Sequence, residues 1–176
     1  MASTIIPTSA PPQALRPVAH GGISIRPIDG ADASALSAFY HGLSPSSRHD
    51  RFLGACGDAA LAAAAVRLAG EPGFVAVVDA AGPLDGEIVG HATLSPDGSG
   101  GAEIAFAIAD TWRGRGIGTR LMGHVVEAAT RTGVRRLVAA TYADNIPMRR
   151  ILRGAGLRVE RDVVDGGIEE LTLAVG

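Results

Sequence analysis

The chain has 176 residues, of which 47% are hydrophobic and 19% charged, and its formal net charge is −2. This balance predicts one globular domain and excludes a dedicated nucleic-acid binder, which would carry an excess of basic residues. No apolar run approaches the ~18 residues of a membrane-spanning helix, so no membrane partner is expected. The one cysteine, Cys56, permits no intrachain disulfide, which fits a reducing cytoplasm.

The first 22 residues differ in composition from the rest of the chain. They hold Pro7, Pro11, Pro12 and Pro17, and their one charged side chain is Arg16. A segment so rich in proline has little reason to pack, so residues 1–22 are predicted to be a flexible N-terminal tail. Residues 23–176 are then expected to form the folded domain.

The folded part is predicted to begin with a strand and a helix. Residues 23–26 alternate in hydrophobicity, as a half-buried strand does. Residues 29–43 then carry apolar side chains at helical spacing, and Asp29 or Asp32 can cap the start of this helix.

Two further helices are expected next. Ser44 followed by Pro45 is typical of an N-cap and a first helical position, and this helix should end near Leu53. Asp58 is predicted to cap a third, alanine-rich helix over residues 59–69.

The middle of the chain is predicted to form three strands. Residues 74–80 and 86–94 are apolar runs separated by a turn at Gly82-Pro83. A glycine-rich loop over residues 95–101 then leads to the central strand, residues 103–109.

The last third alternates helices and strands. A helix is predicted over residues 117–133, a strand over 136–142, a short helix over 145–155, and a terminal hairpin of residues 157–164 and 168–175. The whole order predicts an α+β fold, with a mixed sheet and helices on its faces.

The glycine turn over residues 113–118 carries the strongest functional signal. It connects a strand to a helix, and the N-terminus of a helix attracts anions through its unpaired N–H groups and its dipole. The turn lacks the Gly-x-Gly-x-x-Gly spacing of a dinucleotide site and the Lys-Ser/Thr end of a P-loop. The sequence therefore predicts a phosphate-bearing ligand of another kind.

Arg113-x-x-Gly116-x-Gly118 resembles the acetyl-CoA pyrophosphate signature of the GNAT N-acetyltransferase superfamily. Asn145-x-x-Met148 resembles the second cofactor motif of that family, in which an Asn opens a helix. The resemblance implies a central mixed sheet of six to seven strands, splayed between the fourth and fifth. It also implies acetyl-CoA as acyl donor, bound by Phe106, Ala107, Ile108, Arg113, Gly114, Arg115, Gly116, Ile117, Gly118, Thr119, Asn145 and Met148.

Residues 43–52, LSPSSRHDRF, are similar to a segment of the bacterial Pat-type protein lysine acetyltransferases, except that Ser46 stands where Pat has Glu. This resemblance implies a protein lysine as acceptor, with an acyl-CoA synthetase as an example of the partner. A small amine acceptor, a non-catalytic acetyl-CoA sensor and a nucleotide-binding module stay open as alternatives, as does the choice between monomer and homodimer.

Acetyl transfer needs a base, because a lysine with a pKa of about 10.4 is only about one part in 2,500 neutral at pH 7. Glu103, on the strand that leads into the glycine turn, is the candidate; its alternative is a solvated strand residue. Glu87, Glu169 and Asp110 are weaker candidates. The N–H groups of Phe106, Ala107 and Ile108, freed by a bulge, would bind the oxyanion as in the family.

Two expected absences complete this interpretation. Many GNAT enzymes place a proton-donating tyrosine seven residues after the Asn, and here that position is Leu152. The leaving thiolate would then depart as an anion or take a proton from water. The five histidines show no metal-ligand spacing, so no metal cofactor is expected.

Overall fold

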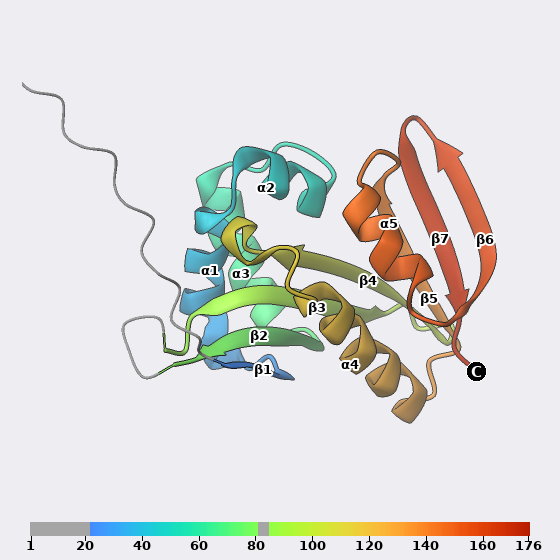
Figure 1. Cartoon of the computed structure of the whole chain (residues 1–176), viewed down its shortest axis with the longest axis horizontal. Coiled ribbons are helices and arrows are strands. Elements are labelled where there is room, and N and C mark those ends of the chain that lie inside the picture. The colour runs from blue at the N-terminus through green and yellow to red at the C-terminus, as the bar shows by residue number, and fades with distance from the viewer. Residues whose placement is uncertain (1–21, 81–84) are drawn as a thin grey trace, which may run out of the picture.

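The computed structural model describes residues 22–80 and 85–176 (Figure 1). The predicted tail therefore lies outside the described residues apart from Gly22, which opens the first strand, and so does the predicted turn at Gly82-Pro83.

Every predicted strand and helix of the folded domain is found. The strands are β1 (Gly22–Pro27), β2 (Gly73–Asp79), β3 (Ile88–Pro96), β4 (Gly101–Ile108), β5 (Arg136–Tyr142), β6 (Arg158–Asp165) and β7 (Ile168–Ala174). The helices are α1 (Ala33–Gly42), α2 (Pro45–Phe52), α3 (Asp58–Ala69), α4 (Ile117–Arg131) and α5 (Ile146–Arg153). Single 3-10 turns, η1 (Gly30–Asp32) and η2 (Asp110–Trp112), precede α1 and follow β4.

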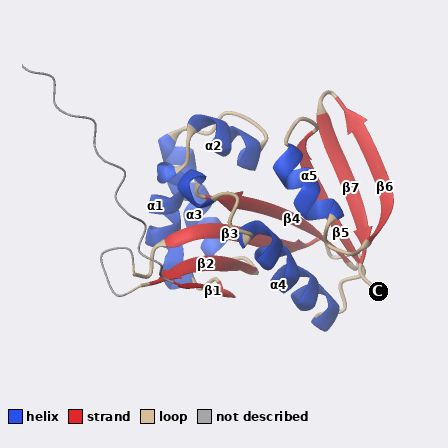
Figure 2. Ribbon diagram, viewed as in Figure 1, coloured by secondary structure: helices blue, strands red, loops and turns tan. Residues whose placement is uncertain are grey.

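The strands form one sheet in the order β1-β2-β3-β4-β5-β7-β6. Neighbours are antiparallel except β4 and β5, which are parallel and pair only from Gly101–Glu103 to Arg136–Val138. Beyond Glu103 the two strands diverge, so the sheet opens into an arm of β1–β4 and an arm of β5, β7 and β6 (Figures 1 and 2). This confirms the expected mixed sheet, splayed between its fourth and fifth strands.

Helices cover both faces of the first arm because its strands are apolar on both sides. Phe74, Ala76 and Val78 of β2 join the core beneath α4. Val75 and Val77 face the opposite way, into a second core with α1 and α3. The helix α4 therefore lies on one face of the sheet, and α1 and α3 lie on the other.

The helix starts show which local signals were interpreted correctly. Ser44 is the N-cap of α2 and its hydroxyl accepts from the N–H of Ser47, with Pro45 in the first turn, as predicted. The predicted cap of α3 was wrong: Gly57 is the N-cap, and Asp58 is the first helical residue. There its carboxylate can still favour the positive end of the helix dipole. Within the described residues, no helix is both long and apolar enough to cross a membrane.

Candidate active site

A cavity of about 440 Å³ lies where β4 and β5 separate. Six parts of the chain line it: α2, β4, the loop into α4, the first turn of α4, β5 and α5. Among the residues predicted to bind the cofactor, the cavity brings together Phe106, Ala107, Ile108, Arg113, Gly114, Gly116, Ile117, Gly118, Thr119, Asn145 and Met148. The gap in the sheet is therefore also where the predicted ligand residues meet.

The loop before α4 is shaped to leave N–H groups open. Gly116, at φ 76°, is the N-cap of α4, and no side chain caps the helix. The helical ladder begins with the N–H of Arg120, which bonds the carbonyl of Gly116. The N–H groups of Ile117, Gly118 and Thr119 therefore have no partner in the helix and can bind an anion. A Cβ at Gly114 or Gly116 would meet nothing within 4 Å, so the space above the loop is open.

The structure shows contacts of Gly118 and Arg115 that the sequence did not indicate. A Cβ on Gly118 would lie 2.5 Å from Cδ1 of Ile151, so this glycine lets α4 approach α5 closely. The guanidinium of Arg115 stacks on the ring of Trp112, 4.6 Å from its centroid, and Arg115 does not line the cavity.

The exposed edge of β4 supplies further N–H groups, but not through a bulge. The predicted bulge was wrong: β3 and β4 pair without a register shift from Gly90↔Ile108 to Pro96↔Ala102. Ala109 donates to Val89 of β3, so by strand alternation the N–H of Ala107 also points toward β3. The N–H groups of Phe106 and Ile108 then point toward the gap, because β5 no longer pairs there.

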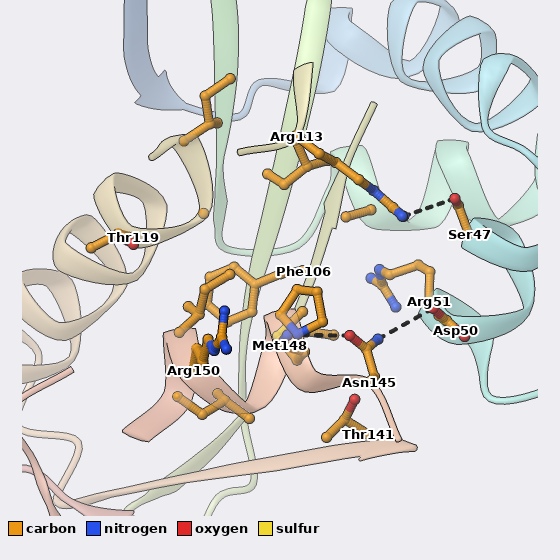
Figure 3. Close-up of a pocket in the computed structure, with 18 of the residues that line it drawn as sticks. Ser47, Asp50, Arg51, Phe106, Arg113, Thr119, Thr141, Asn145, Met148 and Arg150 are labelled. Atoms are coloured by element: carbon orange, nitrogen blue, oxygen red, sulfur yellow. Dashed lines mark hydrogen bonds between the residues drawn. The ribbon is translucent and has the colours of Figure 1, made fainter. Parts of the chain in front are cut away.

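Helix α2 is tied to the anion-binding loop by a charged network. The carboxylate of Asp110 accepts from the hydroxyl of Ser47 at 2.6 Å and from the N–H of Ser44 at 2.9 Å. Arg113 donates to the Ser47 oxygen at 2.8 Å (Figure 3). Burial alone would raise the pKa of Asp110, but these hydrogen bonds and the charge of Arg113 lower it, so Asp110 is held as an anion.

Asn145 both caps α5 and crosses the cavity. Its Oδ1 accepts the N–H of Met148 at 3.2 Å, and its Nδ2 donates to Oδ2 of Asp50 at 3.2 Å (Figure 3). Asn145 is thus the N-cap of α5, and one hydrogen of its amide remains for a ligand.

Glu103 lies at the closed end of the gap. It is exposed, it stands opposite Ser95 of β3 and Val138 of β5, and it does not line the cavity. Two of the weaker candidates are engaged elsewhere. Asp110 belongs to the network with Ser47, and Glu169 is fully buried against Arg149 and Arg153.

Several lining residues were not among the predicted site residues: Ser47, Asp50, Arg51, Thr141 and Arg150. A signal existed for the first three, because they lie in the segment over residues 43–52 that resembles Pat. That segment indicated an acceptor, but nothing in it indicated that α2 forms a wall of the cofactor cavity. Thr141 and Arg150 carried no such signal.

A helix N-terminus that binds anions, followed along the cavity by an open strand edge, fits a long ligand with phosphates at one end and amides along its arm. These features fit a CoA thioester, the acyl donor that the sequence resemblance implies. Residues 37–157 match the model of the acetyltransferase (GNAT) family. The chain belongs to this family and is an acetyl-CoA-dependent acetyltransferase.

Sequence relatives agree with this assignment. The chain is 32% identical over 148 residues to acetyltransferase PA5475 of Pseudomonas aeruginosa, a match that covers 81% of this chain and 78% of that protein. It is 44% identical over 55 residues to acetyltransferase Pat of Mycolicibacterium smegmatis, a match that covers 31% of this chain but only 16% of Pat. Similarity to Pat is therefore local.

Solved structures show the same fold. The GNAT domain of PAT from S. lividans superposes with a TM-score of 0.70 at 24% identity, covering 85% of this chain and 89% of that one. The structure of yncA from Salmonella typhimurium with its cofactor acetyl-CoA superposes with a TM-score of 0.61 at 21% identity, covering 86% and 92%.

Proposed function

We propose that this enzyme transfers acetyl directly from acetyl-CoA to an amine, and that the favoured acceptor is a lysine ε-amine of a protein such as an acyl-CoA synthetase. The observation that carries the acceptor assignment is the position of α2. The segment that resembles the Pat-type enzymes forms the cavity wall through Ser47, Asp50 and Arg51, beside the open edge of β4. A reducing cytoplasm is the proposed location.

The donor is proposed to lie along the gap. Its pyrophosphate would accept hydrogen bonds from the N–H groups of Ile117, Gly118 and Thr119, with the charge of Arg113 nearby. Its pantetheine arm would follow the free edge of β4, with Asn145 and Met148 on the opposite wall. Arg115 lies outside the cavity wall, so it can act on the donor only from the solvent side of the loop.

The chemistry is a nucleophilic substitution at the thioester carbonyl. The neutral amine attacks the carbonyl carbon, the N–H groups of Phe106 or Ile108 stabilise the oxyanion, and the C–S bond breaks as the amide forms. Glu103 is proposed to accept the amine proton, through water where it does not reach directly. It stands at the end of the gap opposite the anion-binding loop. With Leu152 in place of a tyrosine, the sulfur leaves as a thiolate or takes a proton from water.

The proposal is tested by thiol release from acetyl-CoA against lysine peptides, an acyl-CoA synthetase and a panel of small amines. The 16 Lys and Arg residues of the enzyme are all arginine, so the enzyme has no lysine of its own. Any acetyl-lysine signal therefore comes from the acceptor. Turnover with the synthetase or the peptides supports the proposal. Turnover with small amines alone would move the acceptor to that class, and binding of acetyl-CoA without turnover on any amine would indicate a sensor.

A further inference from the structure

Arg51 is a cavity-lining cation whose charge no protein carboxylate offsets. Within the residues that the structure describes, no carboxylate oxygen lies within ion-pairing distance of its guanidinium, and residues 1–21 and 81–84 contain no Asp or Glu. Its Nε is buried and has no hydrogen-bond partner. A buried donor without a partner is costly, so this position is suited to a ligand that supplies an acceptor.

The aromatic rings beneath Arg51 fix where its charge lies. The guanidinium carbon is 5.2 Å from the ring centroid of Phe52 and 5.9 Å from that of Tyr40. Tyr40 is fully buried in the core formed with α1 and α3, on the face of the sheet opposite α4. Arg51 therefore lies on the side of the cavity that faces this core, and in Figure 3 its side chain projects from α2 between the Ser47–Arg113 and Asp50–Asn145 bonds.

Besides Arg51, three charged residues line the cavity: Asp50, Arg113 and Arg150. Arg113 stands on the loop before α4, and Arg150 stands on α5, across the cavity from Arg51 (Figure 3). Arg113, on the anion-binding loop, is therefore placed for the phosphates of the donor. Asp50 is the one carboxylate among the lining residues, and it accepts from Asn145 rather than from Arg51.

A cation that lines the cavity without a carboxylate partner opposes the approach of an ammonium group, unless the acceptor brings its own anion. A guanidinium binds a carboxylate through two parallel N–H bonds, a geometry that no other side chain offers. We propose that Arg51 binds a carboxylate of the acceptor, so that the preferred acceptors carry this group close to the reacting amine. This inference rests on the proposed amine acetylation, and it narrows the acceptor class.

The carboxylate can come from two sources, and matched acceptor pairs distinguish them. One pair is a lysine peptide with a glutamate beside the lysine and its twin with glutamine there. The other pair is an L-amino acid and its amide. The members of each pair are nearly equal in size, and thiol release at saturating acetyl-CoA is compared per neutral amine, because the α-amine of an amino acid and that of its amide differ in pKa.

In at least one pair, kcat/KM for the carboxylate member is expected to exceed that of its neutral twin by about 10-fold or more, the range of a charged hydrogen-bonded pair. Arg51→Met should remove this preference by lowering the rate with the carboxylate member alone, without changing KM for acetyl-CoA. Arg51→Lys keeps the positive charge but not the two parallel N–H donors, so it should retain part of the carboxylate preference. Arg161→Met, at an exposed site on β6, is the matched control and should behave as the wild type.

Equal rates within both pairs for the wild-type enzyme would overturn the proposal, and this comparison needs no variant to fold. It would also be overturned if Arg51→Met lowered the rate with both members equally, as expected of a structural role. A raised KM for acetyl-CoA would make Arg51 a donor ligand instead. Absence of thiol release with every acceptor would contradict the proposed function itself, a result distinct from release without a carboxylate preference.

Discussion

Asn145 donates a hydrogen bond of 3.2 Å from Nδ2 to Oδ2 of Asp50, so α5 and α2 are joined across the cavity in which we place the donor (Figure 3). The Oδ1 of the same amide is occupied by the N–H of Met148, so Asp50 fixes the end of Asn145 that faces the gap. A residue of the Pat-like segment thereby orients a residue of the second cofactor motif.

Replacing Asp50 is expected to weaken donor binding. Asp50→Ala removes one hydrogen bond worth about 1 kcal/mol, so KM for acetyl-CoA should rise about five-fold. Asp50→Asn keeps an oxygen acceptor and should stay closer to the wild type. Asp144→Ala, at an exposed site next to Asn145, is the control. Steady-state kinetics with acetyl-CoA as the varied substrate make the measurement, and an unchanged KM for Asp50→Ala would mean that the bond has no influence on the donor.

Glu103→Gln is expected to lower kcat/KM for the acceptor by about 100-fold at pH 7 and to leave acetyl-CoA affinity unchanged. The deficit should shrink as pH rises toward the pKa of the amine, because the acceptor then loses its proton without a base. Glu160→Gln on β6 provides the comparison at a remote carboxylate. A pH–rate profile from pH 7 to 10 makes the measurement, and a wild-type rate at pH 7 would remove Glu103 from the base role.

Gly116→Ala tests the backbone of the anion-binding loop. The added Cβ meets no atom within 4 Å, but φ is 76°, so the cost comes from the left-handed conformation at about 1–2 kcal/mol. We expect lower thermal stability and at least about a ten-fold rise in the Kd of CoA, because the N–H groups of the first turn would be re-aimed. Calorimetric titration with CoA makes the measurement. Gly123→Ala, within α4 and with no atom near its Cβ, should retain binding and is the control.

Glu169→Ala is expected to destabilise the fold by about 2–3 kcal/mol. Its carboxylate is fully buried. The Oε1 atom accepts a hydrogen bond from Arg153 at 2.6 Å, and Oε2 forms an ion pair with Arg149 at 2.5 Å; both arginines are on α5. Loss of one partner from a buried ion pair costs about 3–5 kcal/mol, and we discount this because both arginines can turn toward solvent. Glu170→Ala, at the next and half-exposed position, should change stability by less than about 0.5 kcal/mol. Urea unfolding compares the two variants, and equal losses would refute the anchoring role.

His91 predicts a dependence of stability on pH. Its ring is fully buried, and its Nδ1 lies 2.8 Å from the hydroxyl of Tyr40. Burial, with the nearby charge of Arg51, lowers the pKa of His91 to about 3, although Asp32 acts in the opposite direction. The folded state therefore holds the neutral ring, while the unfolded chain takes up a proton near pH 6.5.

The sign follows from this difference. The contribution of His91 is complete above about pH 6.5 and is lost as pH falls toward 3, by about 2 kcal/mol between pH 7 and pH 5. His91→Gln should flatten this part of the stability curve, whereas His41→Gln, at an exposed site on α1, should not. Urea unfolding at both pH values makes the measurement. Parallel curves for the wild type and His91→Gln would contradict the assignment.

Much of the fold could be predicted from the sequence, because its signals are local. Ser44 and Pro45 mark the start of α2 within two residues, and strand β5 has the bounds that its apolar run predicted. The errors were also local: Asp58 is one residue past the cap, and no bulge interrupts β4. Gly57, and not the side chain of Asp58, occupies the N-cap position of α3. The N–H groups of β4 are left free because β5 diverges, and not because of a bulge.

In the candidate site, too, local features could be predicted from the sequence and long-range contacts could not. The sequence alone determined the anion-binding loop, because Arg113, Gly116 and Gly118 lie within six residues and their geometry needs only a strand and a helix on either side. The tertiary structure alone decided that α2 lines the cavity, since the bonds from Ser47 to Arg113 and from Asp50 to Asn145 join residues 66 and 95 positions apart. Contacts at such separations depend on how helices pack across an opened sheet, and short-range periodicity carries no information about that packing.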